Sequence, residues 1–155
     1  ALQELPDLLS MLAFFAVVVV LFRSTEFALV VTASLGFHEL GHAAALAWYG
    51  LEWRIAFGWM GAWTWSPLRR RERLTHLQNT VIHLAGPVFS LLLALFALAL
   101  HAVWQPPGQH LYVLASFSAQ MGFINLLPLG GMTDGGKIIR RMVDSIEGAR
   151  ARGLQ

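Results

Sequence analysis

Long apolar runs alternate with short polar breaks along the chain, and they predict helices that cross a membrane. Apolar residues dominate four segments, at 8–22, 27–51, 77–104 and 111–129. A bilayer core needs about 20 apolar residues per helical crossing. The last three segments are long enough, and the first is long enough when its flanking residues are included. The pattern therefore predicts an all-α polytopic membrane protein with about four transmembrane helices, in a single domain over residues 1–155.

The segment between the second and third predicted spans has a different periodicity. Over residues 52–67, aromatic or branched side chains occupy alternate positions, and glycines lie near the middle. A period of two is typical of β-strands. We therefore expect a β-hairpin-like loop over 52–67, and its four tryptophans favour the membrane interface. An aromatic belt with no further role is the alternative interpretation.

Composition and charge support a lipid environment. The chain is 56% hydrophobic and 13% charged, with no Asp, Glu, Lys or Arg from Leu74 to Thr133. Its basic residues cluster at 54–73 and 137–152, beside apolar segments, which favours a topological role over nucleic-acid binding. The positive-inside rule then places both clusters and both termini in the cytoplasm. We expect a multi-pass protein of the cell membrane.

One motif inside the second apolar segment carries candidate chemistry. Residues 38–42 read HELGH and match the pattern His-Glu-x-x-His. Residues four apart share a face of a helix, so His38 and His42 can bind one metal ion. Glu39 lies beside that ion, where it can take a proton from an attacking water molecule. The alternative is a neutral His-Glu-His group, hydrogen-bonded inside a helical bundle.

A hydrolytic zinc site normally has a third protein ligand. The chain has no cysteine, so this ligand is a carboxylate or another histidine. Asp134 is the leading candidate, because it and Glu39 are the carboxylates beside apolar segments and away from the polar flanks. His83 is the alternative ligand, although a hydrogen-bonded packing role suits it better. His38 lies about 18 Å past Glu26 along a helix, in the cytoplasmic half, where the fourth span also delivers Asp134.

Helix-breaking residues surround Asp134. Pro128 is followed by four glycines, at positions 130, 131, 135 and 136. Broken backbone within a membrane is tolerated where it lines a cavity, and hydrolysis needs a cavity that admits water. Asn125, just before this segment, can hold a substrate backbone or neutralise a developing oxyanion. Alternatively, Asn125 only caps the broken helix.

Together these motifs resemble the site-2 protease family of intramembrane zinc metalloproteases. The likeness rests on HELGH at 38–42, AGP at 85–87, NLLP at 125–128 and DGG at 134–136, and it covers roughly residues 30–140. The resemblance implies that His38, His42 and Asp134 are zinc ligands. It also implies that Glu39 is the catalytic base, and that Asn125 and Pro128 shape the substrate site.

The chain departs from the family pattern in two places. The loop between Pro128 and Asp134 is one residue longer than usual, and Met132 and Thr133 replace the leucine that usually precedes the aspartate. Ser90 stands where many members have asparagine. Two glycines in the longer loop make its backbone adaptable.

The resemblance implies an enzyme that hydrolyses peptide bonds in or near the transmembrane helices of membrane-protein substrates, as in regulated intramembrane proteolysis. A catalytically inactive membrane scaffold and an ion or proton pathway are the alternatives. The intact HELGH motif argues against the first, and the lack of inverted repeats argues against the second. The expected partners are the bilayer and a transmembrane substrate, without nucleic acid, and a regulatory membrane partner stays open. We also expect the strand-like loop to offer the unwound substrate an edge for β-augmentation.

Overall fold

A computed structural model describes residues 5–58, 61–67, 74–105 and 108–153. These ranges contain five helices and two strands: α1 (Leu5–Phe22), α2 (Thr25–Trp48), β1 (Arg54–Gly58), β2 (Gly61–Trp65), α4 (His76–Trp104), α5 (His110–Leu126) and α6 (Asp134–Gly153). The mainly helical architecture and the hairpin are confirmed. Residues 68–73 of the basic cluster at 54–73, and residues 106–107 between the third and fourth predicted spans, lie outside the described residues.

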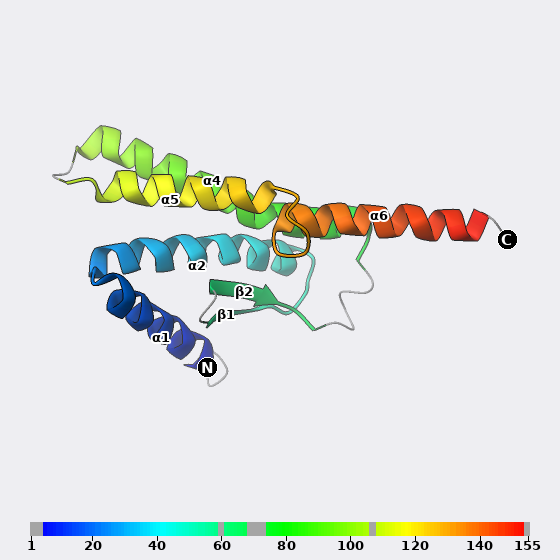
Figure 1. Cartoon of the computed structure of the whole chain (residues 1–155), viewed down its shortest axis with the longest axis horizontal. Coiled ribbons are helices and arrows are strands. Elements are labelled where there is room, and N and C mark those ends of the chain that lie inside the picture. Colours follow the sequence, from blue (N-terminus) through cyan, green and yellow to red (C-terminus); the bar gives the residue numbers. More distant parts are fainter. Residues whose placement is uncertain (1–4, 59–60, 68–73, 106–107, 154–155) are drawn as a thin grey trace.

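Helices α2, α4 and α5 form the centre of the structure. Helix α4 packs against both α2 and α5, and α2 also contacts α5. Helix α1 and the hairpin lie on the opposite side of α2, while α6 extends beyond the bundle along the long axis of the molecule (Figure 1). The bundle therefore surrounds the segment of α2 that carries HELGH.

Local sequence signals set the helix ends. Ser24 caps α2 by accepting a hydrogen bond from the backbone N–H of Phe27, and Thr75 forms a capping box with Gln78 at the start of α4. Helix α5 ends at Leu126, three residues before the end of the predicted span, and Leu127 is extended. This correction has a simple cause, because the residue before a proline disfavours helical backbone.

The hairpin follows α2 in the chain and packs against both α1 and α2. Antiparallel pairing aligns Arg54 with Trp65 and Phe57 with Ala62. On the α1 side, Arg54 Nε lies 3.3 Å from a carboxylate oxygen of Asp7. On the α2 side, the Thr64 hydroxyl donates a 3.0 Å hydrogen bond to the backbone carbonyl of Glu39. Strand β2 is thereby fixed against the helix that carries the metal-binding motif.

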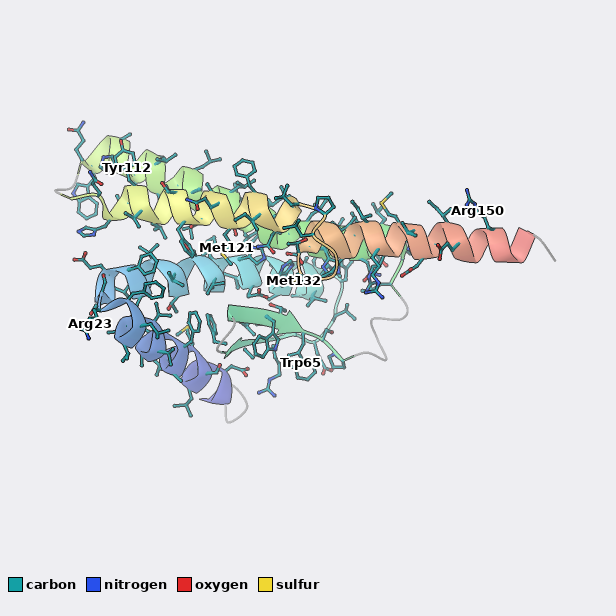
Figure 2. All side chains as sticks on the ribbon, in the orientation of Figure 1. Arg23, Trp65, Tyr112, Met121, Met132 and Arg150 are labelled. Carbon is teal, nitrogen blue, oxygen red and sulfur yellow. The ribbon has the colours of Figure 1, made fainter. Side chains whose placement is uncertain are left out.

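Polar side chains gather inside the bundle, while large apolar side chains lie outside. The buried polar and charged residues include a serine pair across α2 and α5, in which the hydroxyls of Ser34 and Ser118 are 2.8 Å apart. By contrast, Val20, Leu95 and Val103 are 75%, 63% and 87% exposed. Figure 2 shows side chains projecting outward along α1, α4 and α5. An apolar core is present as well, but so many exposed large apolar side chains around buried polar ones are unusual in a water-soluble domain.

One of the described helices, α4, is long and apolar enough that it could cross a membrane. Helix α1 contains a shorter apolar stretch, Asp7–Phe22. The apolar stretch of α2 is interrupted by the polar residues of HELGH, and α5 has only 17 residues. Crossing by α1, α2 and α5 therefore stays a prediction.

Candidate metal centre

Helix α2 brings the two histidines of the motif together on one face. Their ring centroids are 4.9 Å apart and the rings are nearly perpendicular, at 81°. Nε2 of His38 lies 3.2 Å from Nε2 of His42. Both side chains are buried. The four-residue spacing alone accounts for this pairing, since it corresponds to about one helical turn.

The loop after α5 delivers Asp134 to the histidines. Asp134 is the first residue of α6 and is only 2% exposed. Thr133 caps this helix, because its hydroxyl accepts a 3.2 Å hydrogen bond from the backbone N–H of Gly136. The same hydroxyl donates to the carbonyl of Leu127, at 2.6 Å, which closes the loop. The longer spacing after Pro128 is thus accommodated by a compact, capped turn.

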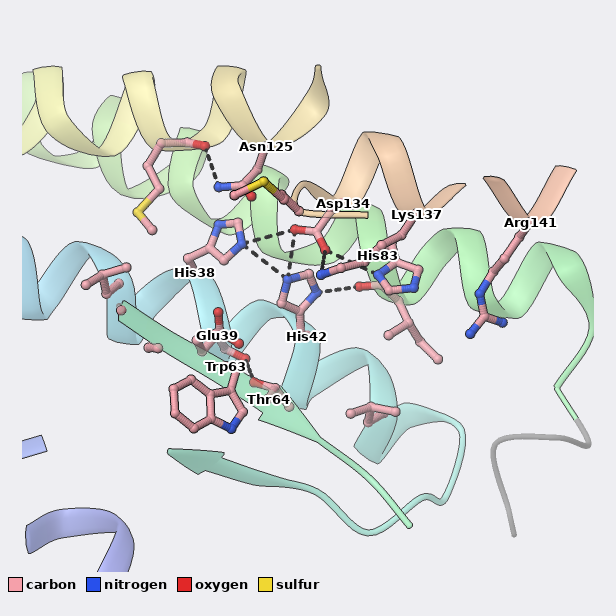
Figure 3. Close-up of a pocket in the computed structure, with 17 residues that line it drawn as sticks. His38, Glu39, His42, Trp63, Thr64, His83, Asn125, Asp134, Lys137 and Arg141 are labelled. Carbon is pink, nitrogen blue, oxygen red and sulfur yellow. Dashed lines mark hydrogen bonds and ion pairs between the residues drawn. The ribbon is translucent and has the colours of Figure 1, made fainter. Parts of the chain in front are cut away.

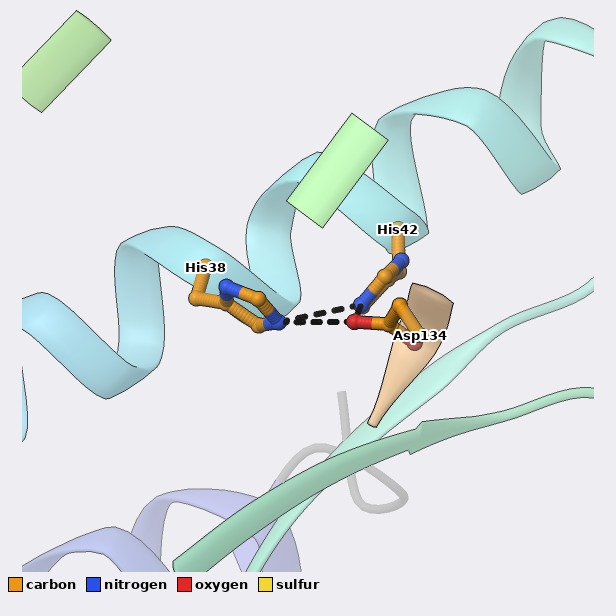
Figure 4. A group of neighbouring side chains, drawn as sticks. All are labelled: His38, His42 and Asp134. Carbon is orange, nitrogen blue, oxygen red and sulfur yellow. Dashed lines mark hydrogen bonds and ion pairs between the residues drawn. The ribbon is translucent and has the colours of Figure 1, made fainter. Parts of the chain in front are cut away.

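The side chains of His38, His42 and Asp134 can hold a metal ion (Figure 4). Oδ2 of Asp134 lies 3.2 Å from Nε2 of each histidine, so the three ligand atoms form an equilateral triangle with the 3.2 Å pair of nitrogens. Tetrahedral zinc, with bonds of about 2.0–2.1 Å, requires neighbouring ligand atoms about 3.3–3.4 Å apart. Two imidazoles and one carboxylate therefore fit zinc in both chemistry and spacing.

Contacts on the far side of each imidazole fix which nitrogen faces the centre. Nδ1 of His42 lies 2.7 Å from the carbonyl oxygen of Ile82, which can only accept, so Nδ1 carries the proton and Nε2 keeps its lone pair. Nδ1 of His38 lies 2.9 Å from the Ser90 hydroxyl, which can accept in the same way. Two lone pairs and a carboxylate oxygen then point at one another, and a cation relieves their repulsion.

The second oxygen of Asp134 has its own partners. Nδ1 of His83 and Nζ of Lys137 lie 3.2 and 3.3 Å from Oδ1, which leaves Oδ2 for the histidine pair. Burial disfavours the charged form of the Asp134 carboxyl, whereas donors at Oδ1, above all the ammonium group of Lys137, favour it. Asp134 is therefore ionised. The prediction of a hydrogen-bonded role for His83 is confirmed.

Small residues let α4 approach these ligands closely. A Cβ atom on Gly86 would collide with Nε2 of His42 and would lie 2.8 Å from Nε2 of His38. A Cβ atom on Gly41 would collide with the carbonyl of Ala85. Small residues at such a crossing allow two helix backbones to come together. The glycine of the AGP segment is thus required by the geometry of the site.

Glu39 shares a cavity with the metal ligands. This cavity has a volume of about 390 Å³ and is bordered by α2, β2, α4, α5 and α6 (Figure 3). Glu39 is 6% exposed, and its carboxylate forms no hydrogen bond or ion pair with another residue in the described part of the chain. The ligands and a buried carboxylate therefore face one cavity, which is large enough to hold water.

The two residues expected to shape a substrate site have different positions. Asn125 lines the cavity, and its Nδ2 donates a 3.0 Å hydrogen bond to the carbonyl of Met121 in its own helix. Pro128 is exposed and is not one of the described residues that line the cavity. Asn125 is therefore close to the reaction space, and a substrate role for either residue stays a prediction.

Sequence reasoning did not identify all the residues that support the site. The sequence marks Ser90 only as a departure from the family pattern, and it does not single out Thr64 or the Ile82 carbonyl. A weak signal exists for part of this set, because positions 82, 86 and 90 recur every four residues and share one face of α4. Thr64 gives no such signal, since its partner is a backbone carbonyl 25 residues away.

Comparisons with known proteins add no family assignment to this geometry. No protein-family profile matches the chain, and no curated protein sequence matches it. The argument for function therefore depends on the motif residues and on the arrangement of the cavity.

Proposed function

We propose that this chain is a multi-pass intramembrane zinc endopeptidase that resembles the site-2 protease family. One observation carries the proposal: the ligand triangle of His38, His42 and Asp134 and the buried carboxylate of Glu39 line the same cavity inside a helical bundle. A structural metal site has no need of an adjacent buried carboxylate, whereas a hydrolytic site needs a base.

The distribution of side chains supports a position in the bilayer. An ionised residue inside a membrane faces the interior of the bundle and has a partner, as Asp134 and the histidines do here. Exposed leucine, valine and phenylalanine side chains cover α1 and α4. Arg150 lies near the end of α6, far from Tyr112 and the α1–α2 turn at Arg23 (Figure 2). With the α6 end in the cytoplasm, the metal centre lies toward the cytoplasmic half.

The residues of the cavity have separable tasks in peptide hydrolysis. Bound zinc would polarise the scissile carbonyl and lower the pKa of water toward neutrality. Glu39 takes the proton of the attacking water and passes it to the leaving amine. Ser90 and the Ile82 carbonyl keep the imidazoles oriented, and His83 keeps Oδ2 of Asp134 directed at the centre.

Strand β2 is suited to hold an extended substrate. Gly61, Ala62, Trp63 and Thr64 line the cavity. In the part of the chain that the structure describes, β2 pairs with β1 along one edge and has no strand on the other. A substrate helix must unwind before cleavage, because its carbonyls are engaged in its own hydrogen bonds. The second edge of β2 would satisfy the exposed backbone by β-augmentation. A photo-reactive residue at position 62 is expected to cross-link to a bound reporter, and the absence of this product would contradict the strand role.

Removal and return of zinc tests the enzymatic proposal. The purified chain in lipid vesicles is expected to contain about one zinc per molecule and to cleave a single-span reporter. A chelator should abolish cleavage, and added zinc should restore it, because a site of this kind loses its chemistry with its metal. Stoichiometric iron in place of zinc, or zinc without cleavage of any membrane peptide, would contradict the proposal.

A further inference from the structure

A basic groove borders the metal cavity on the side of α6. It has a volume of about 530 Å³ and lies between the beginning of α4, near His76 and Asn79, and the first half of α6. Lys137 and Arg141 line both the groove and the metal cavity. The two hollows therefore meet at these side chains.

The charges of the groove are unbalanced. Among the described residues, three basic side chains line it, Lys137, Arg140 and Arg141, together with one carboxylate, Asp144. Lys137 is engaged with Asp134, whereas neither arginine forms a hydrogen bond or ion pair within the described ranges. Figure 3 shows Lys137 extending toward Asp134, with Arg141 further along α6 and away from the ligands. Two guanidinium groups are thus available to an anionic ligand.

We propose that this groove receives acidic side chains on the cytoplasmic flank of the substrate, and that Arg141 is the residue that selects them. The inference rests on the proposed function. A guanidinium group can bind a carboxylate through two parallel hydrogen bonds, which gives it both affinity and geometric selectivity.

The position of Arg141 sets the spacing between the acidic residue and the cleaved bond. Arg141 lies one helical turn beyond Lys137, or about 5.4 Å along α6. Lys137 itself contacts the ligand Asp134. An extended peptide advances about 3.3 Å per residue, so a carboxylate roughly two to four residues from the scissile bond reaches the groove. This continuity with the metal cavity favours a peptide over a lipid headgroup as the occupant.

Such a groove would discriminate strongly among membrane proteins. The cytoplasmic flanks of most transmembrane segments are rich in lysine and arginine. Basic side chains would be repelled by Arg140 and Arg141, and specificity gained by repulsion of wrong partners is common. An acidic flank is therefore an uncommon feature that marks a substrate.

The test compares three single-span reporters. They differ only at the residues two to four positions from the cleaved bond on its cytoplasmic side, which are acidic in the first reporter, amides in the second and lysines in the third. The wild type is expected to cleave the acidic reporter with a kcat/KM about tenfold above that of the lysine reporter. Arg141→Glu should reverse this order. Arg150→Glu, with the same charge change on an exposed part of the same helix, should preserve it. The preference should also weaken as salt is added.

The outcomes separate this inference from the proposed function. Equal cleavage of all three reporters by the wild type, with none by Glu39→Gln, overturns acidic selection and leaves the protease intact. No zinc-dependent cleavage of any reporter overturns both. If Arg141→Glu lowers cleavage of all three reporters alike, and only in vesicles that contain phosphatidylglycerol rather than phosphatidylcholine alone, the groove binds lipid phosphate and the inference is wrong.

Discussion

Glu39→Gln is expected to abolish cleavage of a single-span reporter while the protein keeps its zinc. The substitution preserves the size of the side chain and its place in the cavity, but an amide cannot accept the proton of the attacking water. General-base catalysis contributes about 10²–10⁴-fold to a rate, so the residual activity should fall below about 1% of the wild type. Reporter cleavage and zinc content are measured on the same preparation.

Reporter cleavage tests whether Glu39 is the base, and zinc content tests whether it supports the metal site. Glu39 belongs to neither the ligand triangle nor the hydrogen bonds that orient it, so zinc binding should be close to that of the wild type. Glu147→Gln is the matched control, because it makes the same chemical change at an exposed position of α6. Wild-type cleavage by Glu39→Gln would exclude Glu39 as the base. Loss of zinc from this variant would indicate a structural part in the site instead.

Gly86→Ala is expected to empty the metal site. The added methyl group would occupy the space of the His42 ring and press on Nε2 of His38. The rings must turn away, which breaks the bonds of His42 to Ile82 and of His38 to Ser90. Overpacking of this kind typically costs about 1–3 kcal/mol. We expect zinc affinity to fall by at least about 10–100-fold, as it does when contacts that orient metal ligands are lost.

The expected loss at position 86 is opposite in sign to the usual effect of replacing a helical glycine by alanine. In a helix interior, glycine to alanine normally stabilises by about 1 kcal/mol. Gly36→Ala provides that control, since a Cβ atom at position 36 would meet only the Phe57 ring, at an ordinary 3.6 Å. Zinc content and thermal unfolding are measured on both variants. Full zinc content and wild-type cleavage in Gly86→Ala would show that α4 does not lie against the ligands as the structure places it.

Prediction from sequence succeeded where the information is local. Apolar runs gave helices whose ends lie within three residues of the predicted ones, and a two-residue period gave the hairpin. The pairing of His38 with His42 followed from the helical repeat alone. Asp134 required a further step of elimination, since the chain has few carboxylates beside apolar segments. Its position at the ligand triangle agrees with that reasoning.

Contacts between distant segments could not be predicted in the same way. The hydrogen bond between His38 and Ser90 joins residues 52 positions apart, and that between His83 and Asp134 joins residues 51 apart. Each depends on where α2, α4 and α6 cross and on how each helix is rotated about its axis. Apolar periodicity shows which broad face of each helix is buried, but it does not show which side chain on that face contacts the neighbouring helix.

The sequence by itself determined the four apolar helices, the hairpin and a pair of histidines ready for a metal, because backbone hydrogen bonding and side-chain periodicity act over a few residues. Only the tertiary structure decided which oxygen of Asp134 faces the centre, which groups fix the imidazoles, and that Arg141 reaches the cavity of Glu39. The orientation of the imidazoles depends on the close approach of α2 and α4 at glycines, and the positions of Asp134 and Arg141 depend on the packing of α6 against α4 and α5. Such an approach is a property of two packed surfaces, and neither helix encodes it alone.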